Sequence, residues 1–282
     1  MLRSHLRAVQ VLVISAAVLG VVCAGGSASG QAVAKKDKAA EAIIVDHTCT
    51  NVEAIPDAAI AAAAKVRSVM RHASILQYVG ANRDCGLNLL REENARYDRK
   101  NMKFIGRGHP GAEAVIDDLL TDDLKSDEPG GLIAHTLDQY DVYGTYIYNT
   151  EKWKSGLPNW PYYRDAMLAC EKKYPNKRFV WCTITVVAKY HRADEKRLKV
   201  RDAFNASVRK YCRENGKILF DIADLMSHDP EGKAYTLGGH ESLYSEYTIP
   251  EDLIHIRTAL GKKQVAKAYW YLHARLAGWS PE

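Results

Sequence analysis

The chain has 282 residues, of which 47% are hydrophobic and 26% charged, and its formal net charge at pH 7 is +5. This composition is typical of a folded globular protein, because there is enough apolar material for a core and too little charge imbalance for disorder. A dedicated nucleic-acid binder is not expected, since the basic excess is small and no run of Lys or Arg concentrates it into a stripe.

The N-terminus has the layout of a secretory signal peptide. Arg3 and Arg7 precede a mostly apolar run over 8–22, and small residues follow over 23–30. The apolar run is short for a membrane span, and cleavage sites fit after Gly30 or after Ala34. A lipid anchor on Cys23 is the alternative, although the residue before it is a valine, where lipoproteins carry a small residue. We therefore predict that residues 1–30 are removed and that the protein is secreted or periplasmic, with no stable membrane insertion.

The remaining chain alternates predicted strands with predicted helices. Residues 31–42 are charged and rich in alanine, which indicates a flexible linker. Strands are predicted over 66–70, 102–105, 142–148, 178–187 and 217–222, and helices over 56–64, 112–120, 161–174, 194–215 and 261–277. This alternation predicts one α/β domain over 43–282, a three-layer α/β/α sandwich with a mainly parallel, flavodoxin-like sheet. Ligands are then expected at the carboxyl ends of the strands.

Five cysteines follow the predicted signal peptide: Cys49, Cys85, Cys170, Cys182 and Cys212. The odd number predicts at least one free thiol, unless one pairs between chains. For any one pair, a disulfide and two buried thiols are equally compatible with the sequence. No C-x-x-C occurs, and the cysteine spacings match no zinc knuckle.

A glycine-rich turn follows the predicted strand over 102–105. Residues 106–111 match G-x-G-x-x-G, the pattern of a dinucleotide-binding turn. We reject that interpretation, because Pro110 removes an N–H group that would face a pyrophosphate and because an exported protein rarely meets NAD. No cofactor is predicted. The same glycines allow close backbone approach and offer N–H groups that suit an oxyanion.

Two further features have the residue types of a hydrolytic site. Ser74 follows the first strand of the predicted core, where a hydroxyl is well placed to act as a nucleophile. Asp252 stands three residues before His255, a spacing at which a carboxylate can orient an imidazole and fix its tautomer. Each feature alone is weak, because serines often cap helices and histidines often lie beside acids on a surface.

The order of these features along the chain resembles that of the SGNH (GDSL-like) hydrolase superfamily. The sequence is most similar to SGNH hydrolase-like proteins whose first conserved motif reads H-x-S-V-G. The matching pieces are V-D-H-T-C-T (45–50), H-A-S (72–74), I-G-R-G-H-P-G (105–111), Y-P-N-K-R-F-V-W (174–181), L-F-D-I-A-D (219–224), H-D-P-E-G (228–232), D-L-I-H (252–255) and A-R-L-A-G-W (274–279). The resemblance thus spans about 43–279.

The resemblance implies a catalytic triad and a reaction class. Ser74 would be the nucleophile, His255 the general base and Asp252 the residue that orients it. Such a site hydrolyses or transfers acyl groups on oxygen without a metal or cofactor. For an exported protein, the expected substrate is an acylated carbohydrate or a small ester.

The resemblance also suggests residues that would hold the substrate. The N–H groups of Ser74 and Gly108 would form part of the oxyanion hole, and His72 is a candidate substrate-binding residue. Asn149 could donate its side-chain amide to the oxyanion, or be an ordinary turn residue at a strand end.

Two departures from the family pattern leave other functions open. Leu76 stands where H-x-S-V-G has its glycine, which would place a bulky side chain near the substrate, and Gly108 stands where the family has its oxyanion asparagine. A catalytically degenerate carbohydrate-binding or envelope protein is therefore one alternative, and a polysaccharide O-acyltransferase is another. An α/β-hydrolase is disfavoured because the chain has no G-x-S-x-G.

Four aromatic residues near the proposed site have two interpretations. Trp153, Trp160, Tyr244 and Tyr247 could stack on sugar rings. Core packing explains most Trp and Tyr residues equally well.

Overall fold

The sheet is the centre of the fold. The computed structural model describes residues 41–72, 75–106, 132–135, 160–188, 195–252 and 254–281. Six strands in these ranges form one sheet in which every neighbouring pair is parallel, in the order β1-β6-β5-β4-β2-β3. The strands are β1 (Ile43–Val45), β2 (Ser68–His72), β3 (Met102–Gly106), β4 (Leu132–His135), β5 (Arg178–Cys182) and β6 (Ile218–Phe220).

The strand order confirms the predicted fold class. From β3 through β2, β4 and β5 to β6, the order is the 2-1-3-4-5 order of flavodoxin-like sheets. Strand β1 extends this sheet at the β6 edge, where Ile43 pairs with Ile218 and Val45 with Phe220. Because all strands are parallel, their carboxyl ends lie at one edge of the sheet, where such folds place their ligands.

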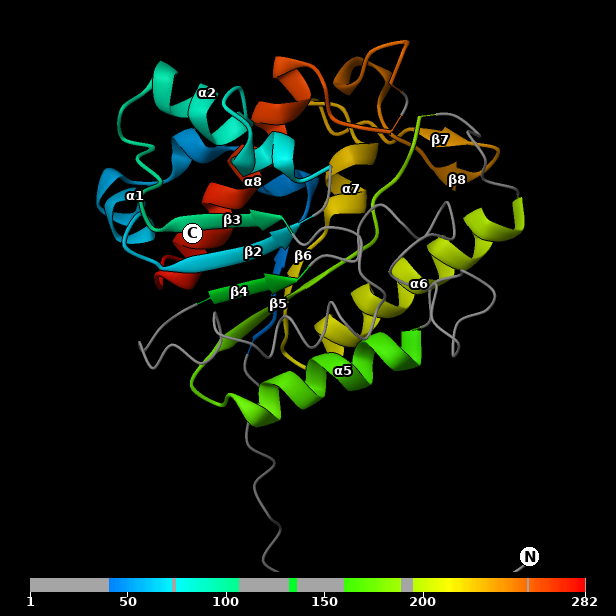
Figure 1. Cartoon of the computed structure of the whole chain (residues 1–282), viewed down its shortest axis with the longest axis horizontal. Coiled ribbons are helices and arrows are strands. Elements are labelled where there is room, and N and C mark those ends of the chain that lie inside the picture. Colours follow the sequence, from blue (N-terminus) through cyan, green and yellow to red (C-terminus); the bar gives the residue numbers. More distant parts are fainter. Residues whose placement is uncertain are drawn as a thin grey trace, which may run out of the picture. The chain divides into compact units, whose positions relative to one another are not determined.

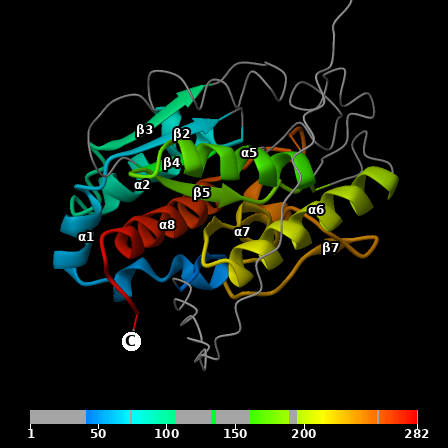
Figure 2. The ribbon, with the colours of Figure 1, turned by 90° about the horizontal axis from the view of Figure 1, so that it is seen from below.

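Helices cover both faces of the sheet (Figures 1 and 2). One layer contains α5 (Trp160–Lys173) and α6 (Glu195–Glu214). The other contains α1 (Asp57–Ala63), α2 (Gly86–Glu93) and α8 (Ala259–Leu276). The short helix α7 (Ile222–Ser227) follows β6 directly. Shorter elements are η1 (His47–Thr50), η2 (Val52–Ala54), η3 (Gln77–Ala81), η5 (Ser245–Tyr247) and the hairpin of β7 (Thr236–Leu237) and β8 (His240–Glu241).

The two layers have separate hydrophobic clusters. Helix α8 lies in the larger cluster, and the five residues predicted to form its apolar face are all buried: Val265, Ala268, Tyr269, Leu272 and Leu276. The smaller cluster joins α5 and α6 to the other face of the sheet around Trp181. Burying both faces in this way stabilises a parallel sheet, whose strands need cover on each side.

Two predicted strands are longer than the strands observed. The prediction over 178–187 becomes β5, which ends at Cys182. Beyond Cys182 the chain stays buried, but it is not a strand. The backbone of Ile184 is hydrogen-bonded by the side chain of Asn205, which accepts from the Ile184 N–H at 2.7 Å and donates to the Ile184 carbonyl at 2.9 Å. The prediction over 217–222 ends at Phe220, because Asp221 caps α7 by accepting from the Asp224 N–H.

Other predictions match, shift or lie outside the described ranges. Helix α1 and strand β3 are where the sequence predicts them, and β2 begins two residues later than predicted. Gly216, predicted to end the helix over 194–215, has a φ of 61°, a left-handed conformation that glycine adopts without steric cost. The predicted helix over 112–120 and strand over 142–148 lie outside the described residues. Strands β1 and β4 and helix α2 were not predicted.

Among the helices of the described ranges, none has the length and apolar character needed to cross a membrane.

The five cysteines that follow the predicted signal peptide are buried free thiols, and no disulfide joins any two of them. Burial raises the pKa of Cys170 to about 11 and that of Cys212 to about 12, chiefly by desolvation. Because the thiolate is the reactive form, we expect the native, processed protein to react negligibly with 5,5′-dithiobis(2-nitrobenzoate). In guanidinium chloride all five should react, as absorbance of the released thionitrobenzoate would show. Rapid reaction of the native protein would contradict this.

A buried histidine should make the fold sensitive to acid. The Nδ1–H of His273 donates to the Tyr269 carbonyl at 2.9 Å, and its Nε2 accepts from the Ser68 hydroxyl at 2.9 Å. Desolvation lowers the pKa of His273 from 6.5 to about 4, with a smaller contribution from Arg178. Between these pH values the unfolded chain binds the proton and the folded chain does not, so stability falls as the pH falls.

The expected loss from this histidine is about 3 kcal/mol between pH 6.5 and 4. Urea unfolding across this pH window should show a shallower pH dependence in His273→Gln than in the wild type, because glutamine does not titrate. If the free energy of unfolding depends equally on pH in the two proteins, His273 is not the cause of the sensitivity to acid.

Candidate functional site

The structure brings Asp252 and His255 together just before α8. The Nδ1–H of His255 faces the Asp252 carboxylate, with both oxygens 2.8 Å away. One of these oxygens also accepts the backbone N–H groups of Ile254 and His255, each at 3.2 Å, so the turn itself fixes the carboxylate. Thr258 then begins α8 as its N-cap by accepting from the Gly261 N–H at 3.3 Å.

Electrostatics keep the Asp252 carboxylate ionised. Burial raises its pKa, but the hydrogen bonds and charge of His255 and the backbone N–H groups outweigh this effect, and the net pKa is below its ordinary value. Arg257 adds an ion pair at 2.9 Å. A carboxylate that stays ionised can hold the imidazole tautomer with its proton on Nδ1 and stabilise the imidazolium formed during catalysis.

The segment after Ser74 reaches this pair through Tyr78. Tyr78 lies in η3, and its ring centroid is 5.7 Å from that of His255. Two cations face the Tyr78 ring, the guanidinium of Arg257 at 5.3 Å and the ammonium of Lys262 at 5.4 Å. Neither Tyr78 nor Arg257 was predicted as a site residue, because their proximity depends on how η3 packs beside the loop before α8.

Three of the predicted site residues, Ser74, Gly108 and Asn149, lie outside the described residues. Their roles remain predictions. The strands that precede two of them are described: β2 ends at His72 and β3 at Gly106, and these two residues are paired in register. The chain therefore enters the Ser74 segment and the 106–111 turn from neighbouring positions at the carboxyl edge.

His72 itself is at the end of β2, with only 6% of its surface exposed. Its ring contacts Phe104 at a centroid distance of 6.2 Å. A role in substrate binding stays a prediction for this residue.

Leu76 is a core residue in the structure. Its side chain is fully buried in the larger hydrophobic cluster, together with Ile75 and Val79. The sequence suggested that this leucine would crowd the substrate. Its full burial gives no sign of a side chain exposed to a substrate, and its effect on the Ser74 site stays a prediction.

The aromatic residues considered for sugar stacking pack against other aromatic residues. Trp160 contacts Tyr163, Trp181, Phe204 and Tyr211, with centroid distances of 5.4–6.4 Å. Tyr244 and Tyr247 are buried and contact each other at 5.0 Å. Core packing accounts for these three, and Trp153 lies outside the described residues.

No protein-family model matches the chain, and no curated protein sequence matches it. Among solved structures, the chain is similar to an acetyl xylan esterase with 16% identity and a TM-score of 0.46, covering 72% of this chain and 98% of that chain. An acetyl-xylooligosaccharide esterase from Geobacillus Stearmophilus, in a mutant form, has 14% identity and a TM-score of 0.46, with 77% and 95% covered. A protein from Parabacteroides merdae assigned as a GDSL-like lipase has 15% identity and a TM-score of 0.45, with 75% and 97% covered.

Proposed function

We propose that the protein is an exported serine acyl-ester hydrolase in which Ser74, His255 and Asp252 form the catalytic triad. The observation that carries the proposal is the Asp252–His255 pair at 2.8 Å, with the His255 ring against Tyr78, four residues after Ser74. A carboxylate, an oriented imidazole and a hydroxyl at the carboxyl edge of a parallel sheet are the parts that serine ester hydrolysis requires.

The strand register supports an oxyanion hole beside the nucleophile. His72 pairs with Gly106, so Ser74 and Gly108 each follow their strand by two residues. Neighbouring strands are about 4.8 Å apart, so the ends of β2 and β3, from which the two segments continue, are close together. Backbone N–H groups of Ser74 and Gly108 would then donate to the oxyanion, and each such donor contributes a factor of about 10²–10³ in rate.

The reaction proceeds through an acyl-enzyme. His255 accepts the Ser74 hydroxyl proton, and the serine oxygen attacks the ester carbonyl to give a tetrahedral oxyanion. His255 then donates that proton to the leaving alcohol oxygen as its bond to the carbonyl carbon breaks. Water, deprotonated by His255, attacks the acyl-serine and releases the carboxylic acid, which regenerates the Ser74 hydroxyl.

An O-acylated carbohydrate is the proposed substrate. The predicted signal peptide places the protein outside the cytoplasm, where acylated polysaccharides are abundant esters. Of the two departures that left a degenerate site open, Leu76 has its side chain fully buried in the core, which weakens the argument from this residue, and Gly108 lies outside the described residues. The Asp252–His255 pair supports catalysis rather than carbohydrate binding alone.

Turnover of p-nitrophenyl acetate by the processed protein tests the activity, and acetate release from acetylated xylan tests the substrate class. Hydrolysis of the first without the second would keep the esterase and reject acetylated xylan. Acyl transfer to an added sugar acceptor in preference to water would identify the acyltransferase instead. No covalent acyl-enzyme and no turnover of any ester would reject the proposed function.

A further inference from the structure

A second group of polar residues lies at the same edge of the sheet, three strands away from β2. His47 begins η1, directly after β1, and Asp224 is in α7, directly after β6. His228 follows the last residue of α7. Because β1 and β6 are parallel neighbours, the segments that leave them meet although they are 177 residues apart. Among the described residues, the contacts of His47, Asp224 and His228 with one another involve neither Asp252 nor His255, so this group is distinct from that pair.

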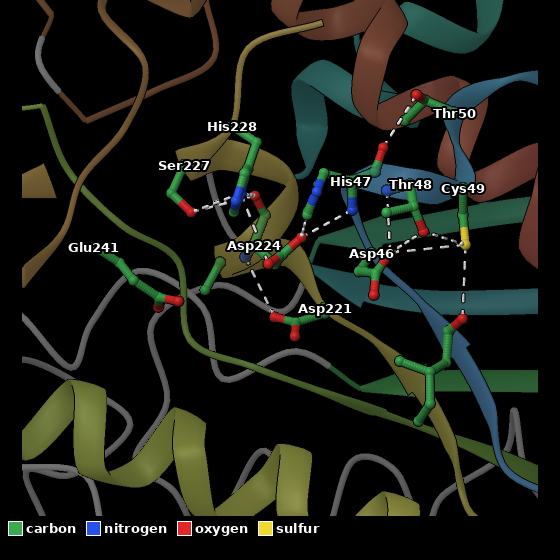
Figure 3. A network of polar contacts seen from close by, with 12 residues as sticks. Asp46, His47, Thr48, Cys49, Thr50, Asp221, Asp224, Ser227, His228 and Glu241 are labelled. Carbon is green, nitrogen blue, oxygen red and sulfur yellow. Dashed lines mark hydrogen bonds and ion pairs between the residues drawn. The ribbon is translucent and has the colours of Figure 1, made fainter. Parts of the chain in front are cut away.

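Asp224 is the centre of the group (Figure 3). Its carboxylate accepts the backbone N–H of His47 at 2.8 Å and lies 2.5 Å from the His47 Nδ1. The His228 Nδ1 is 2.8 Å from the Asp224 carbonyl and 3.7 Å from the second carboxylate oxygen. The two imidazoles are stacked, with centroids 3.7 Å apart and planes 6° from parallel.

The charge and exposure of the group suit a cation. The Asp224 side chain is 19% exposed, and those of His47 and His228 are 26% and 14% exposed. In the part of the chain that the structure describes, the ion-pair partners of this carboxylate are the two histidines, with no lysine or arginine among them. A half-buried carboxylate without a fixed positive charge favours binding of a cation.

The three side chains are close enough together to reach one small transition-metal ion. Each of the three residues offers a ligand atom, and these atoms lie within 4.8 Å of one another. Bonds of about 2.0–2.2 Å in a tetrahedral arrangement place ligand atoms about 3.3 Å apart. At present the His47 Nδ1 is 2.5 Å from one carboxylate oxygen and the His228 Nδ1 is 3.7 Å from the other, so both contacts must adjust when an ion binds. Binding requires one of the two stacked imidazole rings to rotate. The nitrogen lone pair of each ring lies in the ring plane, and two parallel planes cannot both contain the same ion.

We propose that His47, Asp224 and His228 bind one divalent first-row transition-metal ion, with Zn²⁺ as the representative ion. Two imidazoles and a carboxylate suit this class of metal, whereas Mg²⁺ and Ca²⁺ prefer oxygen ligands. The ion links the end of β1 to the end of α7 and leaves its remaining coordination position to water. This proposal does not depend on the proposed esterase activity.

Titration of the protein with Zn²⁺ by calorimetry tests the proposal. The protein is produced from its full-length sequence with the N-terminal processing that the host performs, without a polyhistidine tag, and is treated with a chelator and desalted before titration. The wild type should bind about one Zn²⁺ per chain, and more weakly as acid protonates the imidazoles. His228→Gln and Asp224→Asn should each weaken binding by more than about tenfold.

The matched control is His240→Gln. His240 also has an aspartate partner, Asp202 at 2.7 Å, but no second imidazole among the described residues forms a metal-ligand group with them, so this variant should bind Zn²⁺ like the wild type. Ser74→Ala should do so as well, which separates this site from the proposed triad.

Thermal unfolding with and without Zn²⁺ is a second measurement, which can also be made on variants of low stability. Zn²⁺ should raise the unfolding midpoint of the wild type, and the increase should be lost in His228→Gln. Equal Zn²⁺ affinity in the wild type and His228→Gln, no binding to the wild type, or tighter binding of Mg²⁺ would each overturn the proposal.

Discussion

Ser74→Ala should lower kcat/KM for p-nitrophenyl acetate by at least about 10³-fold, because the variant has no oxygen to form the acyl-enzyme. His255→Ala should have a similar effect, since the serine hydroxyl then has no base. The double variant should be no worse than either single variant, as expected for residues that act as one unit. Asp252→Asn should lower kcat/KM by the same factor or a smaller one, because Asp252 acts through the orientation of His255.

Matched controls separate catalysis from folding. Ser207→Ala removes a hydroxyl on α6 that donates to the Ala203 carbonyl, and His240→Ala removes a histidine that is paired with an aspartate elsewhere in the fold. Both controls should keep wild-type turnover, and all variants should have the far-ultraviolet circular dichroism of the wild type. Losses that add up in the double variant, or activity retained in Ser74→Ala, would reject the triad.

Asp221→Ala should lower the free energy of unfolding by about 3–5 kcal/mol, because it leaves a buried cation without its main partner. The Asp221 side chain is almost fully buried, and its carboxylate accepts from the Arg209 Nε at 2.6 Å, the Arg209 Nη2 at 2.9 Å and the Thr183 hydroxyl at 2.8 Å. In the variant, Arg209 would keep its ion pair with Glu241 at 2.6 Å. Urea unfolding followed by tryptophan fluorescence measures the change.

Asp165→Ala is the control for this loss of charge. Asp165 is exposed and pairs with its neighbour Arg164 at 2.7 Å. Exposed ion pairs contribute about 0–1 kcal/mol, so this variant should unfold nearly like the wild type. A loss below 1 kcal/mol in Asp221→Ala would mean that water or a rearranged Glu241 satisfies Arg209.

Burial changes the interpretation of several residues that the sequence singled out. Leu76, Tyr244 and Tyr247 have the residue types of a blocked or sugar-binding site, yet all three pack inside the protein. A single sequence does not tell a residue beside a ligand from a residue in the core, because both environments favour large apolar side chains. The structure therefore weakens both the argument for a degenerate site and the argument for aromatic sugar stacking.

The sequence by itself determined the fold class and the local turn that holds Asp252 and His255. Alternating strand and helix patterns predicted the parallel sheet with helices on both faces, since the two periods differ and are set by local side-chain direction. The three-residue spacing of Asp252 and His255 indicated that the two side chains can meet, because they are neighbours in the chain, and the resemblance to SGNH hydrolases assigned them to one site.

Only the tertiary structure decided which distant segments meet. Strand β1 was not predicted, since three residues are too few for a hydrophobic period, and its pairing with β6 is what brings His47 to Asp224 and His228. The approach of Tyr78 to His255 likewise depends on how η3 packs beside the loop before α8. Such contacts join residues that are far apart in the chain, and their geometry is set by strand order and core packing rather than by local sequence.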